Sequence, residues 1–324
     1  MPGICIYGTV YNNVHTIEES IKSVWRPEYE IVIVDSYSTD GTWEKLVKLK
    51  KEYNLKLYRY KCSRGLGRHI ALYKCPEKSI TAYFDLDTKY NYAFHKVVEA
   101  AQIYGSASAH CLVVVEREYA IKRGGWRDLN WGEDTDFAVR MCARIHVPVL
   151  IGENASPELT LIWRERRYAS NFTGYVKRVV KMHLDSSIAY GLNISNILKL
   201  GSKRLFILSP VLIPYVKFMK TRNYYDNLPN SSVEILERLS HMIPPRKLGI
   251  SEDLFFFNID YCACKAIKEC FNLDDVIRSI VSPPVFKLVG LTKTIWITYF
   301  KDPSILLGFH VRKPIDLRKI RIVV

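Results

Sequence analysis

The sequence predicts an α/β fold, in which a mostly parallel sheet is flanked by helices and is followed by a mainly helical C-terminal region. In the first half, strand-like runs such as Ile4 to Val10 and Glu30 to Val34 alternate with helical segments. From about residue 166, longer helical patterns are separated by clusters of Pro, Gly and Asn. We therefore expect one domain over residues 1–165 and a basic, mainly helical region over residues 166–324.

Each element of the first half follows from a local pattern. The run IVIV before Asp35 is continuous and apolar, as in a strand that is covered on both faces. Thr16 to Glu19 has the pattern of a capping box, and apolar residues recur at helical spacing after it. The other expected elements are strands at 55–60, 81–84 and 112–116 and helices after Gly41, at 93–104 and from about 133.

Composition and charge exclude several classes of protein. With 324 residues, 48% of them hydrophobic, the chain is not disordered, collagen-like or a coiled coil. The net charge is +14, and its distribution is uneven: residues 1–150 carry 21 basic and 18 acidic side chains, whereas residues 151–324 carry 26 and 15. Such a basic half could bind nucleic acid, an anionic membrane surface or a phosphorylated substrate.

Apolar runs and cysteines indicate the compartment. A membrane-spanning helix needs about 18 to 20 consecutive apolar residues, and no run in the sequence is that long. Two interrupted runs, Leu205 to Val216 and Val285 to Phe300, fit either buried helices or helices lying in a lipid headgroup region. Eight cysteines without a repeated C-x-x-C spacing argue against a disulfide framework and a structural zinc site. We expect a cytoplasmic protein, with the cytoplasmic membrane face as an alternative.

Acidic residues stand where strands of the predicted sheet end, which is where ligands collect in parallel sheets. Asp35 ends the second strand, and Asp85 and Asp87 follow the strand that starts near Thr81. Carboxylates one residue apart can approach one hard cation, and oxygen ligands of this kind suit Mg²⁺ or Mn²⁺. Two acids in a solvated loop are the alternative.

Glu133 and Asp134 open the helix in WGEDTDFAVR. The positive end of a helix dipole stabilises an ionised carboxylate in the first turn. Asp134 shares a face with Phe137 and Met141, so we expect it to point inward beside a cleft, as a candidate general base. The alternative is an acid that only favours the helix terminus, which is the reason we expect for Glu133 and Asp136.

Two glycines lie between Arg64 and Arg68 in the segment Ser63 to His69. Glycines let backbone N–H groups approach an anion, and guanidinium groups can bind diphosphate oxygens. The segment is neither a Walker loop nor a G-x-G-x-x-G fingerprint. A tight turn with exposed arginines is the alternative.

Five segments occur in an order that resembles the family 2 glycosyltransferases: ICIYGTVYNN, EIVIVDSYSTDGT, RGLGR, AYFDLDTKY and RGGWRDLNWGEDTDFAVR. They span residues 3 to about 144. The resemblance implies the GT-A fold, a nucleotide-diphosphate sugar donor, a divalent metal (Mn or Mg) and inversion at the anomeric carbon. The enzyme would be of the hexosyltransferase type.

The resemblance also assigns roles to residues of this chain. Those lining the nucleoside pocket would be Thr9, Tyr11 and Asp35, with Asp35 reading the base edge. Arg64 and Arg68 would lie near the diphosphate. Asp87 would be the direct metal ligand, and Asp85 would approach the ribose or the metal. Residues on the sugar and acceptor side would be Gly124, Gly125, Trp126 and Glu133. Asp134 would be the base.

The chain departs from the family in two respects. Thr9 replaces the usual Pro near the end of the first strand, which we expect a loop position to tolerate. The Q-x-x-R-W signature of processive members is absent, so we expect one sugar to be transferred per encounter. A later cluster could contact donor or acceptor phosphates, or simply be a solvated helix start: Trp163, Arg164, Arg166 and Arg167.

Other functions fit less well. FDLD is similar to the motif of haloacid dehalogenase phosphatases, with Gly132 and Asp136 as further matches, but DLDTK replaces the D-x-D-G-T of that family. A nucleotidyltransferase would need glycines where YNN stands after the first strand. A basic nucleic-acid-binding protein remains as an alternative, although no nucleic-acid module is visible and we expect no such partner. We expect an acceptor glycan or lipid-linked phosphate, and with the latter an anionic membrane surface.

Overall fold

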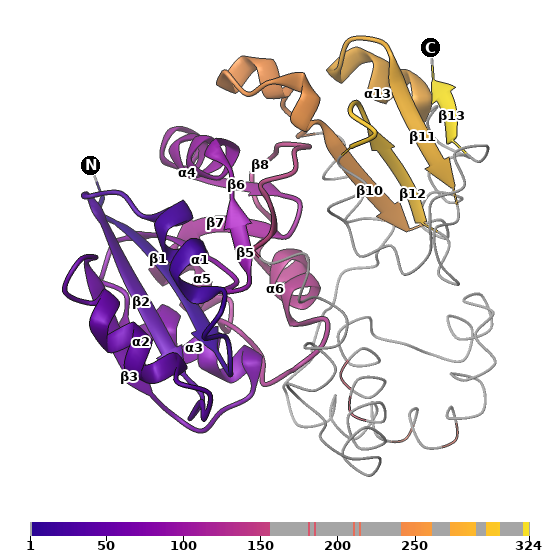
Figure 1. Cartoon of the computed structure of the whole chain (residues 1–324). Coiled ribbons are helices and arrows are strands. Elements are labelled where there is room, and N and C mark those ends of the chain that lie inside the picture. Colours follow the sequence, from indigo (N-terminus) through magenta and orange to yellow (C-terminus); the bar gives the residue numbers. More distant parts are fainter. Residues whose placement is uncertain are drawn as a thin grey trace.

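The structure of the chain is a computed structural model, shown in Figure 1. It describes residues 2–155, 241–260, 273–289, 296–304 and 320–323, together with the single helical positions 181, 185, 210 and 214. The domain boundary expected near residue 165 lies outside these residues.

A seven-stranded sheet forms the N-terminal part, in the order β3-β2-β1-β4-β7-β6-β8. Its strands are β1 (Ile4–Val10), β2 (Tyr29–Asp35), β3 (Leu55–Arg59), β4 (Ile80–Tyr83), β6 (Ser106–Ala109), β7 (Leu112–Glu116) and β8 (Ile145–His146). The first four are parallel to one another. Strand β7 runs antiparallel to both β4 and β6, and β8 is parallel to β6. The predicted mostly parallel α/β sheet is confirmed.

Helices cover both faces of this sheet, because alternate side chains of its central strands point to opposite sides. Ile6 of β1 packs in a core that includes side chains of α1 (Ile17–Val24), α2 (Thr42–Leu49) and α4 (Tyr92–Tyr104). Tyr7 packs on the other face, with side chains of α3 (Arg64–Lys74), α5 (Arg117–Lys122) and α6 (Glu133–Met141). The N-terminal part therefore has three layers.

The start of α1 differs from its prediction. Thr16 precedes the helix, but its side chain makes no capping hydrogen bond. Its hydroxyl donates instead to the carbonyl of Leu86, at 2.8 Å. Leu86 lies between Asp85 and Asp87, so this hydrogen bond holds the acidic loop after β4 against the start of α1.

The described C-terminal part is built on a sheet, and the expectation of a mainly helical region is wrong for these residues. Strands β10 (Phe256–Asp260), β12 (Trp296–Phe300), β11 (Val285–Val289) and β13 (Ile320–Val323) form an antiparallel sheet in that order, beside helix α13 (Leu273–Ile280). The apolar run 285–300 therefore contributes two neighbouring strands, since its β-branched and aromatic residues pack well on a pleated surface.

This second sheet joins the first through the segment after β8. The amide of Leu150 donates to Leu254, and the amide of Phe256 donates to Pro148. A two-stranded pair, β5 (Thr88–Tyr90) with β9 (Gly152–Asn154), holds the same segment beside the acidic loop after β4. None of the helices in the described ranges is long and apolar enough to cross a membrane.

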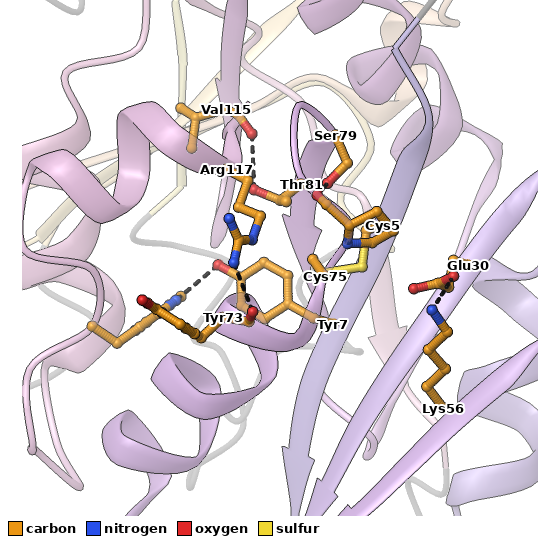
Figure 2. The surroundings of a disulfide bond; sticks show 12 residues. Cys5, Tyr7, Glu30, Lys56, Tyr73, Cys75, Ser79, Thr81, Val115 and Arg117 are labelled. Carbon is orange, nitrogen blue, oxygen red and sulfur yellow. Dashed lines mark hydrogen bonds and ion pairs between the residues drawn. A yellow bond between two sulfur atoms is a disulfide. The ribbon is translucent and has the colours of Figure 1, made fainter.

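A disulfide joins Cys5 of β1 to Cys75, which follows α3 (Figure 2). Both residues are buried, and they are 70 positions apart in the sequence. Cysteine spacing did not predict this pair, because the two residues meet only when α3 packs on β1. The bond fixes the C-terminal end of α3 to β1. The N-terminal half of the same helix carries Arg68, which pairs with Asp85.

Candidate functional site

The carboxyl ends of β2, β1 and β4 lie side by side, and the acidic residues singled out in the sequence follow them. Val10 of β1 pairs with Asp35 of β2, and Tyr7 pairs with Tyr83 of β4. Asp85 and Asp87 come directly after β4. Asp35 and the pair Asp85 and Asp87 therefore lie at the same end of the parallel strands, which we call the acidic edge.

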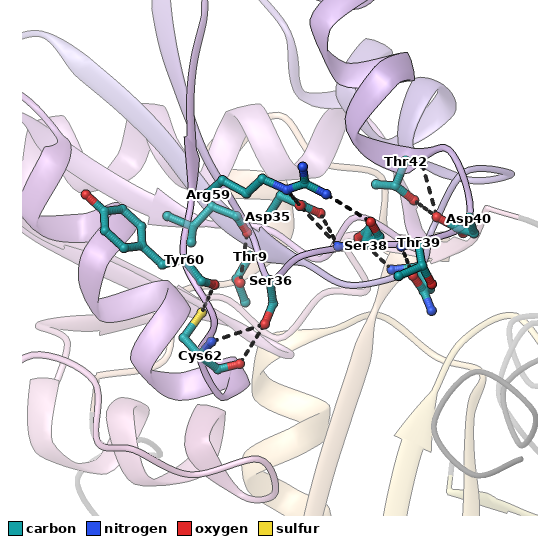
Figure 3. Close-up of polar contacts among 12 residues, drawn as sticks. Thr9, Asp35, Ser36, Ser38, Thr39, Asp40, Thr42, Arg59, Tyr60 and Cys62 are labelled. Atoms are coloured by element: carbon teal, nitrogen blue, oxygen red, sulfur yellow. Dashed lines mark hydrogen bonds and ion pairs between the residues drawn. The ribbon is translucent and has the colours of Figure 1, made fainter.

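Asp35 is completely buried. Its carboxylate accepts a hydrogen bond from Nε of Arg59, at 3.0 Å, and from the amide of Ser38, at 3.1 Å (Figure 3). The predicted direct contact between Asp35 and a base edge does not fit this arrangement, because the carboxylate has no exposed surface. Arg59 is the exposed member of the pair, with 32% of its side chain accessible.

Aromatic rings surround Arg59. The carbon centre of its guanidinium lies 4.9 Å from the ring centroid of Tyr37 and 5.1 Å from that of Trp43. Tyr37 is half exposed and adopts a left-handed backbone conformation, with φ of 56°. Sequence reasoning missed Tyr37 and Arg59 as site residues; the signal that could have found Tyr37 was its place in the turn directly after Asp35.

Thr9 and Tyr11 lie where β1 ends. The hydroxyl of Thr9 donates to the carbonyl of Val34, at 3.0 Å, which ties the ends of β1 and β2 together. Tyr11 is partly exposed in the loop that follows β1. Both predicted pocket residues therefore stand beside Asp35 and its partner Arg59, at one end of the acidic edge.

The segment Ser63 to His69 forms the N-cap and first turns of α3, and is neither an anion-binding loop nor an isolated tight turn. Ser63 caps the helix by accepting from Leu66, and the amides of Arg64, Gly65 and Gly67 donate to Asn130, Leu129 and Ser63 respectively. An anion would find these amides occupied. The glycines serve close packing instead: a Cβ on Gly65 would lie 1.9 Å from the carbonyl oxygen of Arg127.

The two arginines of this segment differ in exposure. Arg64 keeps 37% of its side chain exposed, and it donates to Oε1 of Glu133, at 3.3 Å. Arg68 is buried, with 2% of its side chain exposed, and it donates to the carboxylates of Asp85 and Glu133. Direct contact between Arg68 and a diphosphate does not fit this arrangement, because the guanidinium is buried and pairs with two carboxylates. Its predicted place near a diphosphate stays a prediction.

Helix α6 brings three acids to different environments. Glu133 is buried in its ion pairs with Arg64 and Arg68. Asp136 is also buried, between Arg127 at 2.8 Å and Arg140 at 2.6 Å. The local pattern gave both residues a helix-terminus role, and the family resemblance placed Glu133 on the sugar and acceptor side. Neither showed that both carboxylates pair with buried arginines from other segments.

Asp134 is partly exposed, unlike the two acids beside it in α6. Its charge reaches the ring of Tyr83, where it acts together with the charge of Asp85. Burial, reinforced by these carboxylates, raises the pKa of Tyr83 well above its ordinary value. The first turn of α6 thus faces the same buried tyrosine as the acidic loop after β4.

The acidic loop offers few ligands for a metal. Asp85 and Asp87 are both partly exposed, and Asp85 keeps 43% of its side chain accessible beside Arg68. The described residues contain no group of three or more His, Cys, Asp or Glu side chains that could hold a metal ion. Hard carboxylate oxygens of this kind fit Mg²⁺ or Mn²⁺ when phosphate and water complete the shell.

Gly124, Gly125 and Trp126 form the turn after α5. A Cβ on Gly125 would lie 2.4 Å from Nδ1 of His69, so this glycine lets the turn pack against α3. Trp126 is buried; its indole donates to the hydroxyl of Tyr7, at 2.8 Å, and stacks on Phe137 with ring centroids 4.0 Å apart. Trp126 also lies against Arg68, with 4.7 Å between its ring centroid and the carbon centre of the guanidinium.

The fold and this edge define an α/β domain with an acidic site at the carboxyl ends of parallel strands. Residues 5–155 match the model of the family described as glycosyl transferase family 2. This match covers just under half of the chain, and it supports a glycosyltransferase domain over these residues. A comparison with curated proteins found no match.

Solved glycosyltransferases are among the structures similar to part of this chain. TarS residues 1–349 from S. aureus are 18% identical, with a TM-score of 0.39, and 44% of this chain covers 55% of that one. The same fragment was solved with UDP-GlcNAc, again at 18% identity and a TM-score of 0.39, where 44% of this chain covers 53% of it. The mannosyltransferase PcManGT from Pyrobaculum calidifontis, solved with GDP-Man and Mn²⁺, is 19% identical, with a TM-score of 0.43, and 70% of this chain covers 88% of it. The chain thus spans about half the length of the TarS fragments.

One predicted cluster has no structural account. Its members Trp163, Arg164, Arg166 and Arg167 lie outside the described residues, as does nearly all of the apolar run 205–216.

Proposed function

We propose that this protein is a glycosyltransferase that moves one sugar from a nucleotide-diphosphate sugar to an acceptor hydroxyl or phosphate, with inversion at the anomeric carbon. The family of residues 5–155 supports the class of reaction. The observation that carries the assignment to this edge is the Arg68 bridge, which joins Asp85 after β4 to Glu133 at the start of α6. The bridge links the loop of Asp85 and Asp87, the proposed donor side, to α6, which carries the proposed base Asp134.

The nucleoside would lie over the ends of β1 and β2. Tyr37 and Tyr11 offer aromatic surface for stacking, and Arg59 offers N–H donors to acceptor atoms on the base edge. Asp35 would act through Arg59, because its own carboxylate is buried and holds that guanidinium in place.

The diphosphate would lie beside the loop after β4. Asp87 would be the protein ligand of a divalent cation, Mg²⁺ or Mn²⁺, which would supply positive charge for the departing nucleoside diphosphate. Arg64 is the exposed guanidinium that could add a further charge there, since Arg68 is buried.

Asp134 would take the proton from the acceptor hydroxyl. It is partly exposed, whereas the acids one residue before it and two after it are buried in ion pairs. Only an accessible carboxylate can meet the acceptor, so Asp134 is the member of this helix turn that fits a general base. Attack from the face opposite the leaving group would invert the anomeric carbon.

The test is a binding and transfer assay with a panel of UDP-, GDP-, dTDP- and CMP-sugars, with and without Mn²⁺. Release of the free nucleotide reports turnover even without a known acceptor, because water can accept the sugar. Asp134→Asn should keep nucleotide binding and lose at least about 100-fold in turnover, the size expected for a general base. Asp275→Asn, in the first turn of α13, is the matched control.

Two outcomes would contradict the proposal. Full turnover in Asp134→Asn would remove its role as base. Stabilisation by no sugar nucleotide at all, in a thermal-shift screen of the whole panel, would remove the assignment of this edge as a donor site. The acceptor, whether a glycan or a lipid-linked phosphate, and any attachment to a cytoplasmic membrane face remain proposals that vesicle binding would test.

A further inference from the structure

Arg68 is a charged side chain enclosed by the protein at the centre of the acidic edge. Its two terminal nitrogens donate to different carboxylates, Nη2 to Asp85 and Nη1 to Glu133, the latter at 3.1 Å. The carbon centre of its guanidinium lies 4.8 Å from the ring centroid of Tyr83 and 4.7 Å from that of Trp126. The group is thus held by charge at its edge and by aromatic rings at its faces.

The carboxylates of Asp85 and Glu133 keep the guanidinium of Arg68 charged. Burial opposes ionisation, but the carboxylates of Asp85 and Glu133 outweigh it and hold the pKa of Arg68 above its ordinary value. The remaining nitrogen, Nε, is buried and has no hydrogen-bond partner in the described part of the chain. A solvent-facing arginine would satisfy all its donors, so this arrangement retains the bridge at a cost in hydrogen bonding.

The bridge spans two elements that carry different parts of the proposed reaction. Asp85 belongs to the loop after β4, two residues before the proposed metal ligand Asp87. Glu133 opens α6, one residue before the proposed base Asp134. Helix α3, which supplies Arg68, is itself fixed against β1 by its close packing at Gly67 and by the disulfide at Cys75.

We propose that Arg68 is a positioning residue, which sets the distance between the donor-side acids after β4 and the base at the start of α6. This inference rests on the proposed function. A guanidinium is planar and presents its nitrogens in a fixed fork, so it can hold two carboxylates at one separation. An ammonium group is a point charge on a flexible chain and cannot fix two partners in this way.

The experiment measures turnover and binding separately in Arg68→Lys, which keeps the charge. The probes are UDP and GDP with Mn²⁺ for binding by calorimetry, and release of nucleotide from the sugar-nucleotide panel for turnover. Nucleotide affinity should change by less than about threefold, whereas kcat should fall about 30- to 100-fold, because a displacement near 1 Å can cost that much in rate. KM for the donor should stay close to that of the unmodified protein.

Arg117→Lys is the matched control. Arg117 is also a buried arginine that lies over a tyrosine ring and has an unpartnered Nε, but it stands at the start of α5, beside Ser79 at the opposite end of β4. The control should keep kcat within about twofold. An equal fall in kcat for both variants would show that loss of packing, and not positioning, lowers the rate, and would overturn the inference.

Glu133→Gln tests the inference if Arg68→Lys fails to fold. It removes one anchor of the bridge and keeps the arginine, and it should show the same separation of kcat from binding. In the double variant, kcat should fall no further than in the worse single variant, since both act through one bridge. Additive losses, or an unchanged kcat in Glu133→Gln, would overturn positioning. If the unmodified protein binds no nucleotide and releases none from any donor, the proposed function fails first, and this inference fails with it.

Discussion

Gly67 of α3 lies so close to Thr9 of β1 that a Cβ atom on the glycine would come within 2.2 Å of the threonine hydroxyl oxygen. That hydroxyl donates to Val34 of the neighbouring strand. The helix that carries Arg68 can approach the acidic edge only because this position has no side chain.

Gly67→Ala should therefore lower the free energy of unfolding by about 1–3 kcal/mol, the usual cost of overpacking a buried contact. Urea denaturation followed by circular dichroism measures the change. Gly3→Ala is the control, since nothing lies within 4 Å of a Cβ there. A Gly67→Ala protein as stable as the control would show that α3 can shift outward freely, contrary to the packing described.

Arg59 gives a prediction for nucleotide affinity. If Arg59 donates to the base, Arg59→Gln should weaken binding of the preferred nucleoside diphosphate by about 10- to 100-fold, the range expected for one lost hydrogen bond that involves a charged group. Isothermal titration calorimetry provides the measurement. Arg26→Gln is the matched control, because Arg26 has a similar exposed fraction, 34%, and also pairs with a carboxylate and a tyrosine ring. Unchanged affinity in Arg59→Gln would assign base recognition to other residues.

Asp136 gives a prediction for stability. It is buried between Arg127 and Arg140, so Asp136→Asn would leave two guanidinium groups without their charge partner. We expect a loss of about 3–5 kcal/mol in the free energy of unfolding, as for other broken buried ion pairs. Glu18→Gln, which removes the exposed pairs with Lys22 and Lys45, should cost less than about 1 kcal/mol. Equal costs in the two variants would mean that burial does not strengthen the Asp136 pairs.

His95 gives a prediction for pH dependence. Burial, together with the charge of Arg26, lowers the pKa of His95 from 6.5 to about 4. The unfolded chain therefore takes up a proton at this residue before the folded chain does as the pH falls. The contribution of neutral His95 to stability is complete above pH 6.5, and it is lost progressively as the pH falls to about 4.

Chemical denaturation between pH 7 and pH 4 tests this sign. His95→Gln should reduce the loss of stability across that range, because one group that titrates differently in the two states is gone. A steeper acid loss in His95→Gln than in the unmodified protein would contradict the assignment.

The sequence by itself determined the α/β pattern, the ends of most strands and the acids that follow them. Continuous apolar runs such as IVIV are typical of strands covered on both faces; Asp35 ends its strand, and Asp85 and Asp87 follow the end of theirs. Ordered motifs over the first 144 residues or so also resemble the family whose model matches residues 5–155.

Tertiary structure alone decided which charges are buried and which are exposed. Arg64 and Arg68 are neighbours in one motif, yet one is exposed and the other enclosed, because packing against Tyr83 and Trp126 depends on segments remote in the sequence. The same holds for the disulfide at Cys5 and for the antiparallel sheet after residue 255. Local patterns fix periodicity and strand ends, whereas pairing and burial depend on contacts that only the folded chain creates.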